Sequence, residues 1–295
     1  MHRAKILLML GALSVAALAS DFSGRAALEF TRRAVALGPR PAGSAANRKL
    51  QAYIHGELKT CGCQIADDTF TAATPNGAVA MKNIIAKFPG AQSPGHGSGI
   101  LVITGHYDTK ILPGRNFVGA NDGGSSTGFL LEFARTAAHL FHQKEIDIVF
   151  FDGEEAVGEW SETDSLYGSR HLAGKWAADG TLGRIRALIN VDMTGDKDLD
   201  ILVEANSSNS LQRLIWQTAS EIGYGKYFLD SGGAVDDDHL PFVRRGVNAI
   251  DLIDFDYGPN QAYWHTGEDS MDKISAHSLQ VVGDVLVGTI KKLDQ

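Results

Sequence analysis

The chain has 295 residues, of which 44% are hydrophobic and 21% are charged, and its formal net charge is −8. This composition is ordinary for a globular protein. The acidic balance argues against a nucleic-acid-binding protein, which normally presents a basic face, and the simplest role of the charge is solubility. The length is sufficient for one large α/β domain or two small ones.

The N-terminus has the pattern of a secretory signal peptide. Residues 1–20 start with basic residues, continue with an apolar stretch from Ile6 and end in Ala17-Leu18-Ala19, the small residues of a cleavage site. The apolar stretch is short for a membrane span. We therefore predict that residues 1–19 are removed and that 20–295 form the mature domain, without stable insertion in a membrane. The protein is then exported, to the periplasm or the medium.

Two helices and a strand are predicted in the next part of the chain. Residues 21–38 and 44–62 have apolar side chains at helical spacing, and the loop between them ends in a serine that can cap the second helix. Residues 78–90 have the pattern of a strand and a turn. A single residue separates Cys61 and Cys63, so a disulfide between them would be strained, and we assign them no function.

The remaining chain alternates apolar strands with amphipathic helices. Runs rich in Ile, Val and Leu predict four buried strands, at 99–104, 146–151, 187–191 and 247–253. Helical spacing predicts four helices, at 127–143, 165–178, 211–222 and 275–293. This alternation predicts a single α/β domain with a mixed, mostly parallel, twisted central sheet that helices cover on both faces.

Acidic residues or a histidine follow three of these strands. His106 comes after the first strand, Glu154 and Glu155 come after the second, and Asp192 comes after the third. The carboxyl ends of the strands form the ligand-binding edge of an open α/β sheet. We therefore expect these side chains to converge on one edge.

Two loops add candidates for the same edge. The stretch GANDGGSSTG presents Asp122 just before a helix, and AYWHTGEDS presents His265 after an aromatic pair. Asp, Glu and His without a thiolate make a ligand set that suits zinc in a catalytic site. A metal ion would neutralise the clustered carboxylates, with Glu155 as a ligand and Glu154 free to act as a general base.

Each of these residues alone has a simpler explanation. Asp122 fits an ordinary helix-capping loop, the glutamate pair fits a solvated surface, Asp192 fits a strand end, and His265 fits a satisfied core histidine. Their combination in one chain favours a metal site, but their spacing alone does not identify the reaction.

The order of the motifs resembles the zinc aminopeptidase superfamily. GHYDT, GANDGGSSTG, FFDGEE, NVDM and a late histidine match its metal-binding sequence from His106 to His265. A narrower resemblance, to the glutaminyl-peptide cyclotransferases or glutaminyl cyclases, is carried by DGEEAVGEWSETDSLYGSRHLA, DDDHLPFVRRGV and YWHT. It covers most of the chain after the signal segment, and its first motif is highly specific.

The narrower resemblance implies an acyltransferase that acts on peptides or proteins with an N-terminal glutamine. The enzyme would close this glutamine into pyroglutamate and release ammonia. It also implies one zinc ion per chain, held by Asp122, Glu155 and His265, with Glu154 as the proton-transferring residue. We expect the protein to act as a monomer.

The resemblance implies roles for further side chains. Asp237 would hydrogen-bond near the leaving amide, Asp192 would support that network, and Trp160 and Trp264 would bind the substrate. Animal cyclases carry a histidine near the position that aligns with Asp251, so we expect the proton network to differ in detail here.

Two other functions are compatible with the same residues. A two-zinc aminopeptidase would use His106 and Asp192 as ligands of its second metal, and both are present. A non-enzymatic binding module on this fold is expected to have lost ligands or the base, and the candidates for both remain in this chain.

Overall fold

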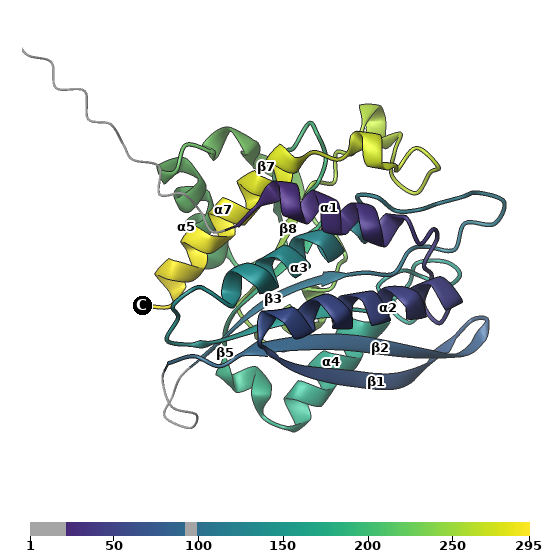
Figure 1. Cartoon of the computed structure of the whole chain (residues 1–295), viewed down its shortest axis with the longest axis horizontal. Helices are drawn as coiled ribbons and strands as arrows, with labels where there is room; N and C mark the ends of the chain where they lie inside the picture. The colour runs from purple at the N-terminus through teal and green to yellow at the C-terminus, as the bar shows by residue number, and fades with distance from the viewer. Residues whose placement is uncertain (1–21, 92–98) are drawn as a thin grey trace, which may run out of the picture.

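A six-stranded mixed sheet crosses the centre of the computed structural model, which describes residues 22–91 and 99–295 (Figure 1). The strand order is β1 (Gln64–Thr74), β2 (Gly77–Phe88), β4 (Glu145–Phe151), β3 (Ile100–His106), β5 (Ile185–Asp192) and β8 (Ala249–Ile253). The last four strands are parallel, whereas the β1–β2 hairpin is antiparallel and joins the sheet beside β4. The predicted mixed sheet in a single domain is confirmed. The predicted signal peptide, 1–19, lies outside the described residues.

Helices cover both faces of the sheet because its central strands are apolar on both faces. One face carries α1 (Gly24–Val35), α2 (Ala45–Leu58), α3 (Gly124–Ala137), α5 (Asn209–Glu221) and α7 (Ala276–Leu293) (Figure 1). The other face carries α4 (Tyr167–Ala178) and the short α6 (Leu240–Val243). Within β3, Leu101 and Ile103 pack into the first layer, and Ile100 and Val102 pack into the second.

The starts of the helices follow from local sequence. Four helices begin after a serine whose hydroxyl accepts a hydrogen bond from a backbone N–H of the first turn, namely Ser23, Ser44, Ser208 and Ser275. Helix α3 instead begins after Gly123, which has a φ of 76°. A Cβ atom at Gly123 would lie 2.3 Å from the Asp108 carbonyl oxygen, so only glycine fits this turn. The turn leaves Asp122 directly ahead of the helix.

Some elements differ from the prediction. The sequence pattern does not predict β1, nor β6 (Ile201–Glu204) and β7 (Phe228–Gly233), which form a separate parallel pair. β1 is a largely exposed edge strand and β6 and β7 are short, so none of them carries a continuous apolar run. The predicted helix 127–143 instead ends at Ala137. The chain turns there, and the backbone N–H groups of Gln143 and Lys144 donate to Asp294.

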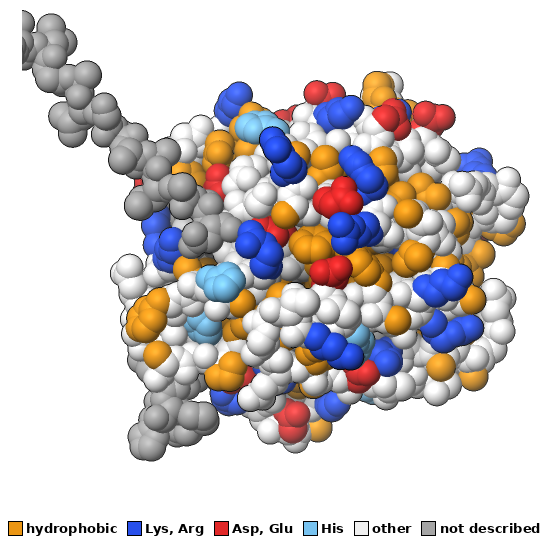
Figure 2. All heavy atoms as spheres, in the orientation of Figure 1, with side chains coloured by type: hydrophobic (Ala, Val, Ile, Leu, Met, Phe, Trp, Pro, Cys, Tyr) orange, Lys and Arg blue, Asp and Glu red, His pale blue; other side chains and the backbone are white. Residues whose placement is uncertain are grey.

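Short 3₁₀ helices complete the fold at Lys59–Cys61, Thr181–Arg184, Gly225–Tyr227, Pro259–Gln261 and Met271–Lys273. Within the described residues, no helix combines the length and apolarity that a membrane crossing requires. On the face shown in Figure 2, acidic and basic side chains are interspersed.

The aromatic contacts of α3 give a direct test of the core. Phe129 is fully buried, with its ring centroid 5.0 Å from that of Phe22 and 6.0 Å from that of Phe133. Phe129→Ala should lower the free energy of unfolding by about 3–5 kcal/mol, because it removes these contacts and leaves a cavity. Urea denaturation followed by circular dichroism measures the change. Phe141→Ala is the control, since Phe141 is 76% exposed, and an equal effect of the two substitutions would contradict the assigned core.

Candidate metal centre and active site

The carboxyl edge of the sheet brings the predicted metal ligands together. Glu155 follows β4, His265 lies in the long connection after β8, and Asp122 stands at the start of α3. The His265 Nε2 atom lies 3.2 Å from Asp122 Oδ2 and 3.0 Å from Glu155 Oε1. One ligand atom from each of the three residues lies within 4.8 Å of the others. Residues more than a hundred positions apart in the chain therefore form one cluster.

The chemistry of this cluster fits a divalent cation. Asp122 and Glu155 are almost fully buried, and the polar neighbour of the Asp122 Oδ2 atom is His265 Nε2, at 3.2 Å. Two carboxylates and an imidazole make the oxygen and nitrogen ligand set of a catalytic zinc site. Burial alone would lower the pKa of His265, but Asp122 and Glu155 raise it to about 10. The Asp122 and Glu155 carboxylates therefore favour a positive charge beside them.

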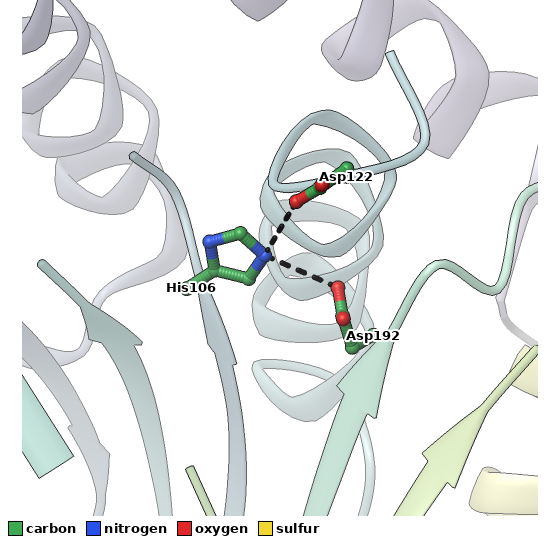
Figure 3. A group of neighbouring side chains, drawn as sticks. All are labelled: His106, Asp122 and Asp192. Carbon is green, nitrogen blue, oxygen red and sulfur yellow. Dashed lines mark hydrogen bonds and ion pairs between the residues drawn. The ribbon is translucent and has the colours of Figure 1, made fainter. Parts of the chain in front are cut away.

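A second group of possible ligands shares Asp122 with the first. His106 Nε2 lies 3.3 Å from Asp122 Oδ1 and 3.2 Å from Asp192 Oδ1 (Figure 3). One oxygen of Asp122 therefore faces His106 while the other faces His265. A carboxylate in this position can belong to either one or two metal centres.

Glu154 lies beside the cluster of candidate metal ligands. Its side chain is almost fully buried, and its Oε2 atom is 3.9 Å from His106 Nδ1. Burial raises the pKa of Glu154 well above its usual value, and the nearby Glu155 and Asp237 carboxylates raise it further, against the opposing effect of His106. A carboxyl group with a raised pKa can both accept and return a proton near neutral pH.

Asp237 is joined to Asp251 through an amide. The Asn190 Nδ2 atom donates to Asp237 Oδ2 and to Asp251 Oδ1, each at 3.0 Å. Burial and then the charge of Asp237 raise the pKa of Asp251 well above its usual value. Burial also raises the pKa of Asp192 to about 7. The predicted network residues therefore lie together, and Asp251 belongs to the same buried acidic group.

A cavity of about 380 Å³ gives access to the candidate metal ligands and to the buried acids beside them. Both predicted substrate-binding tryptophans line it: Trp264 stacks on His265 with ring centroids 4.1 Å apart, and Trp160 is 38% exposed at the mouth. Phe255 lies against Trp264 with a centroid distance of 5.1 Å. The cavity thus combines an aromatic wall with a polar floor formed by Glu154 and the metal cluster.

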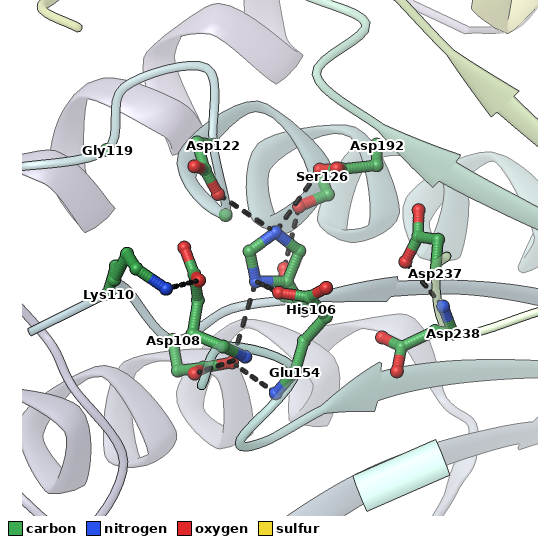
Figure 4. Close-up of polar contacts among 12 residues, drawn as sticks. His106, Asp108, Lys110, Gly119, Asp122, Ser126, Glu154, Asp192, Asp237 and Asp238 are labelled. Carbon is green, nitrogen blue, oxygen red and sulfur yellow. Dashed lines mark hydrogen bonds and ion pairs between the residues drawn. The ribbon is translucent and has the colours of Figure 1, made fainter. Parts of the chain in front are cut away.

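Sequence reasoning assigned no role to three residues that hold the site in place. Asp108 accepts a hydrogen bond from the backbone N–H group of Glu154 at 3.1 Å (Figure 4). It accepts a second one from the backbone N–H group of Glu155 at 3.4 Å. Arg40 is fully buried and donates to the carbonyl groups of residues 118 and 119 in the loop before Asp122. The motif GHYDT contains Asp108, whereas Arg40 lies in none of the motifs that carry the resemblance.

Asp269 is the third such residue. It accepts hydrogen bonds from the backbone N–H groups of Asn121, at 2.8 Å, and Asp122, at 3.2 Å, and from the hydroxyl group of Tyr257 at 2.7 Å. Asp269 lies far from Asp122 in the chain, so no local spacing predicts this contact. Its side chain holds the backbone that carries the candidate metal ligand Asp122.

This arrangement predicts an effect of Asp269 on metal affinity. Asp269→Ala should weaken zinc binding by roughly 10-fold to 100-fold, because residues that support a ligand usually contribute this much. Competition with a coloured chelator measures the affinity. Asp272→Ala is the matched control, because Asp272 is exposed and contacts Ser270 and Lys273 instead. Unchanged affinity in Asp269→Ala would show that the Asp122 loop needs no such support.

The fold and this site together define a member of a known class. The family model named Peptidase family M28 matches residues 83–290, and the chain belongs to that family. A glutaminyl-peptide cyclotransferase from Drosophila melanogaster is 30% identical over 263 residues, covering 80% of this chain and 72% of the relative. Within peptidase family M28, the chain groups with the glutaminyl-peptide cyclotransferases.

Solved structures agree with this placement. An Acidobacteriales bacterium glutaminyl cyclase superposes with a TM-score of 0.89 and 44% identity, covering 97% of this chain and 99% of that one. A Zn-dependent exopeptidase from Parabacteroides distasonis superposes with a TM-score of 0.80 and 27% identity, covering 93% and 99%. The same fold therefore carries both kinds of enzyme, and the site has to distinguish them.

Proposed function

We propose that the protein is a glutaminyl cyclase, which converts the N-terminal glutamine of a peptide or protein into pyroglutamate and releases ammonia. The observation that carries this proposal is the buried Glu154 carboxyl group beside the Asp122, Glu155 and His265 cluster at the floor of an aromatic cavity. The similarity to glutaminyl cyclases over nearly the whole chain supports it.

In the reaction, the α-amine nitrogen of the substrate forms a bond with the side-chain amide carbon, and the bond from that carbon to the amide nitrogen breaks. The substrate supplies its own nucleophile, so the enzyme needs no serine or cysteine. A zinc ion held by Asp122, Glu155 and His265 would polarise the amide carbonyl group and stabilise the charge that develops on its oxygen.

Glu154 moves the proton in this proposal. Its carboxylate takes a proton from the attacking amine and gives it to the departing nitrogen, so the proton balance closes within the site. Asp237 accepts a hydrogen bond from the leaving amide group, while Asn190 and Asp251 hold the Asp237 carboxyl group in place. Asp192 pairs with His106 and supports the same acidic network.

The aromatic wall orients the substrate. Trp160 and Trp264 bound a slot for the glutamine side chain, which holds the reacting ends together and limits the access of water. Since the two reacting groups already belong to one residue, orientation and charge stabilisation supply most of the catalysis.

The second candidate is a two-zinc aminopeptidase. The specific observation in its favour is the group of His106, Asp122 and Asp192, whose ligand atoms are as close together as those of the first cluster. We favour a single zinc ion per chain. In that arrangement His106 and Asp192 belong to the hydrogen-bond network and not to a second metal site. The chain is further proposed to act as a monomer and to be exported after removal of residues 1–19.

Incubation of the mature chain with a Gln-initiated dipeptide tests the function. Ammonia and a pyroglutamyl peptide are the products that the proposal requires. Free glutamine with the shortened peptide would instead identify the aminopeptidase. Sequencing the N-terminus of protein recovered outside the cytoplasm tests the proposed export.

A further inference from the structure

A second cavity continues from the catalytic one. It has a volume of about 340 Å³ and lies over β6, β7 and the segment after β8. Four residues line both cavities and form the wall between them: Ala234, Val235, Ile253 and Phe255. The two cavities therefore meet along one apolar ridge.

The far side of the ridge is built mainly from small and apolar groups. Val203 and Gly233 line it together with Gln261. A Cβ atom built on Gly233 would meet no other atom within 4 Å, so open space borders the backbone of β7 at this point. The space is large enough to hold one or two residues of an extended peptide, at roughly 3.4 Å per residue.

Exposed acidic side chains give the region around the ridge a negative charge. Asp256 lines the second cavity, Asp236 lines the catalytic one beside the ridge, and both are exposed. Neither forms an ion pair with another described residue. Glu204, the other acid of the second cavity, already accepts hydrogen bonds from the hydroxyl group of Ser207 and the backbone N–H group of Val235. Lys110 is the only lysine or arginine among the described residues that line either cavity, and it pairs with Glu155.

We infer that the second cavity binds the residues that follow the N-terminal glutamine, and that it selects neutral or basic side chains there over acidic ones. This inference rests on the proposed function and adds a substrate class to it. A glutamine bound over Glu154 leaves the rest of its peptide at the cavity mouth. The apolar ridge leads directly from there into the second cavity. Asp256 inside that cavity and Asp236 on the catalytic side of the ridge attract positive charge and repel negative charge.

A substitution that fills the second cavity tests its use. Gly233→Leu should lower kcat/KM for the tripeptide Gln-Leu-Lys-amide by about tenfold, because the new side chain occupies the space of the peptide. The same variant should leave kcat/KM for glutamine amide, which ends before the ridge, within about twofold. Gly183→Leu is the matched control, since a Cβ atom there also meets no neighbour and Gly183 lines neither cavity.

The charge preference has its own test. The native chain should favour Gln-Leu-Lys-amide over Gln-Leu-Glu-amide by roughly threefold to tenfold in kcat/KM at low salt, as expected for partly solvated charges. Asp256→Asn should lower this ratio toward one, because only Asp236 of the two exposed acids then remains beside the ridge. Asp230→Asn, an equal charge change at an exposed residue that lines neither cavity, should leave it unchanged.

Binding measurements separate this inference from the proposed function. The affinities of the two tripeptides for the Glu154→Gln variant, measured by calorimetry, should show the same preference even if no ammonia is released in any assay. Equal effects of Gly233→Leu on glutamine amide and on the tripeptide, or equal affinities of the lysine and glutamate peptides, would overturn the inference.

Discussion

The Glu154→Gln variant is expected to lose cyclase activity by about 10³-fold or more in kcat, at the upper part of the range for removal of a general acid–base residue. Glutamine has nearly the same shape as glutamate but cannot accept and return a proton. Glu154 is almost fully buried beside the candidate metal ligands, whereas Glu159 and Asp236, which line the same cavity, are exposed. The assay follows ammonia release from a Gln-initiated dipeptide, with the zinc content measured in parallel.

A surface substitution in the same segment controls for nonspecific effects. Glu162 is exposed and lines neither cavity, so Glu162→Gln should keep activity within about twofold of the native chain, as is usual for surface positions. If Glu154→Gln retained zinc and a native circular dichroism spectrum together with most of its activity, Glu154 would not be the proton carrier.

His265→Ala is expected to remove both the metal and the activity. It takes away the one nitrogen ligand of the cluster, so that among the described side chains Asp122 keeps only its contact with His106 and Glu155 only its contact with Lys110. Zinc content should fall from about one ion per chain to a small fraction, and kcat should fall by about 10³-fold or more, because the polarising ion is lost. Metal analysis after gel filtration and the ammonia assay measure these two effects.

The matched control is an exposed histidine elsewhere in the chain. His277 bonds to the hydroxyl group of Tyr227 at 2.7 Å and lies outside both cavities. His277→Ala should keep its zinc and its activity. A chelator should inactivate the native chain, and added zinc should restore it. Full zinc occupancy in His265→Ala would remove His265 from the ligand set.

The sequence predicted the sheet best where its strands are buried on both faces. β3, β4, β5 and β8 each carry a continuous apolar run and appear close to their predicted positions. β1 is a largely exposed edge strand, and β6 and β7 are short strands that pair only with each other in the described part of the chain. Such strands are defined by their pairing partners and not by an apolar run, so the local pattern does not mark them.

The residues of the candidate site also divide into those that the local sequence marks and those that only the folded structure brings into place. Glu154, Glu155 and Asp192 could be predicted because acids that directly follow buried strands need a partner at the sheet edge. Asp269 and Arg40 act on the backbone near Asp122 from distant positions in the chain. Their roles depend on folded geometry, so no spacing in the sequence marks them. The second cavity also escaped prediction, because it arises where β7 meets the segment after β8.

Zinc-edge anomalous diffraction from crystals of the metal-loaded protein tests the central claim most directly. We expect one strong peak per chain, bounded by Asp122, Glu155 and His265 and adjacent to Glu154. A second peak of similar height between His106 and Asp192 would favour the aminopeptidase. The absence of a peak among the three predicted ligands would contradict zinc-assisted cyclisation at this site.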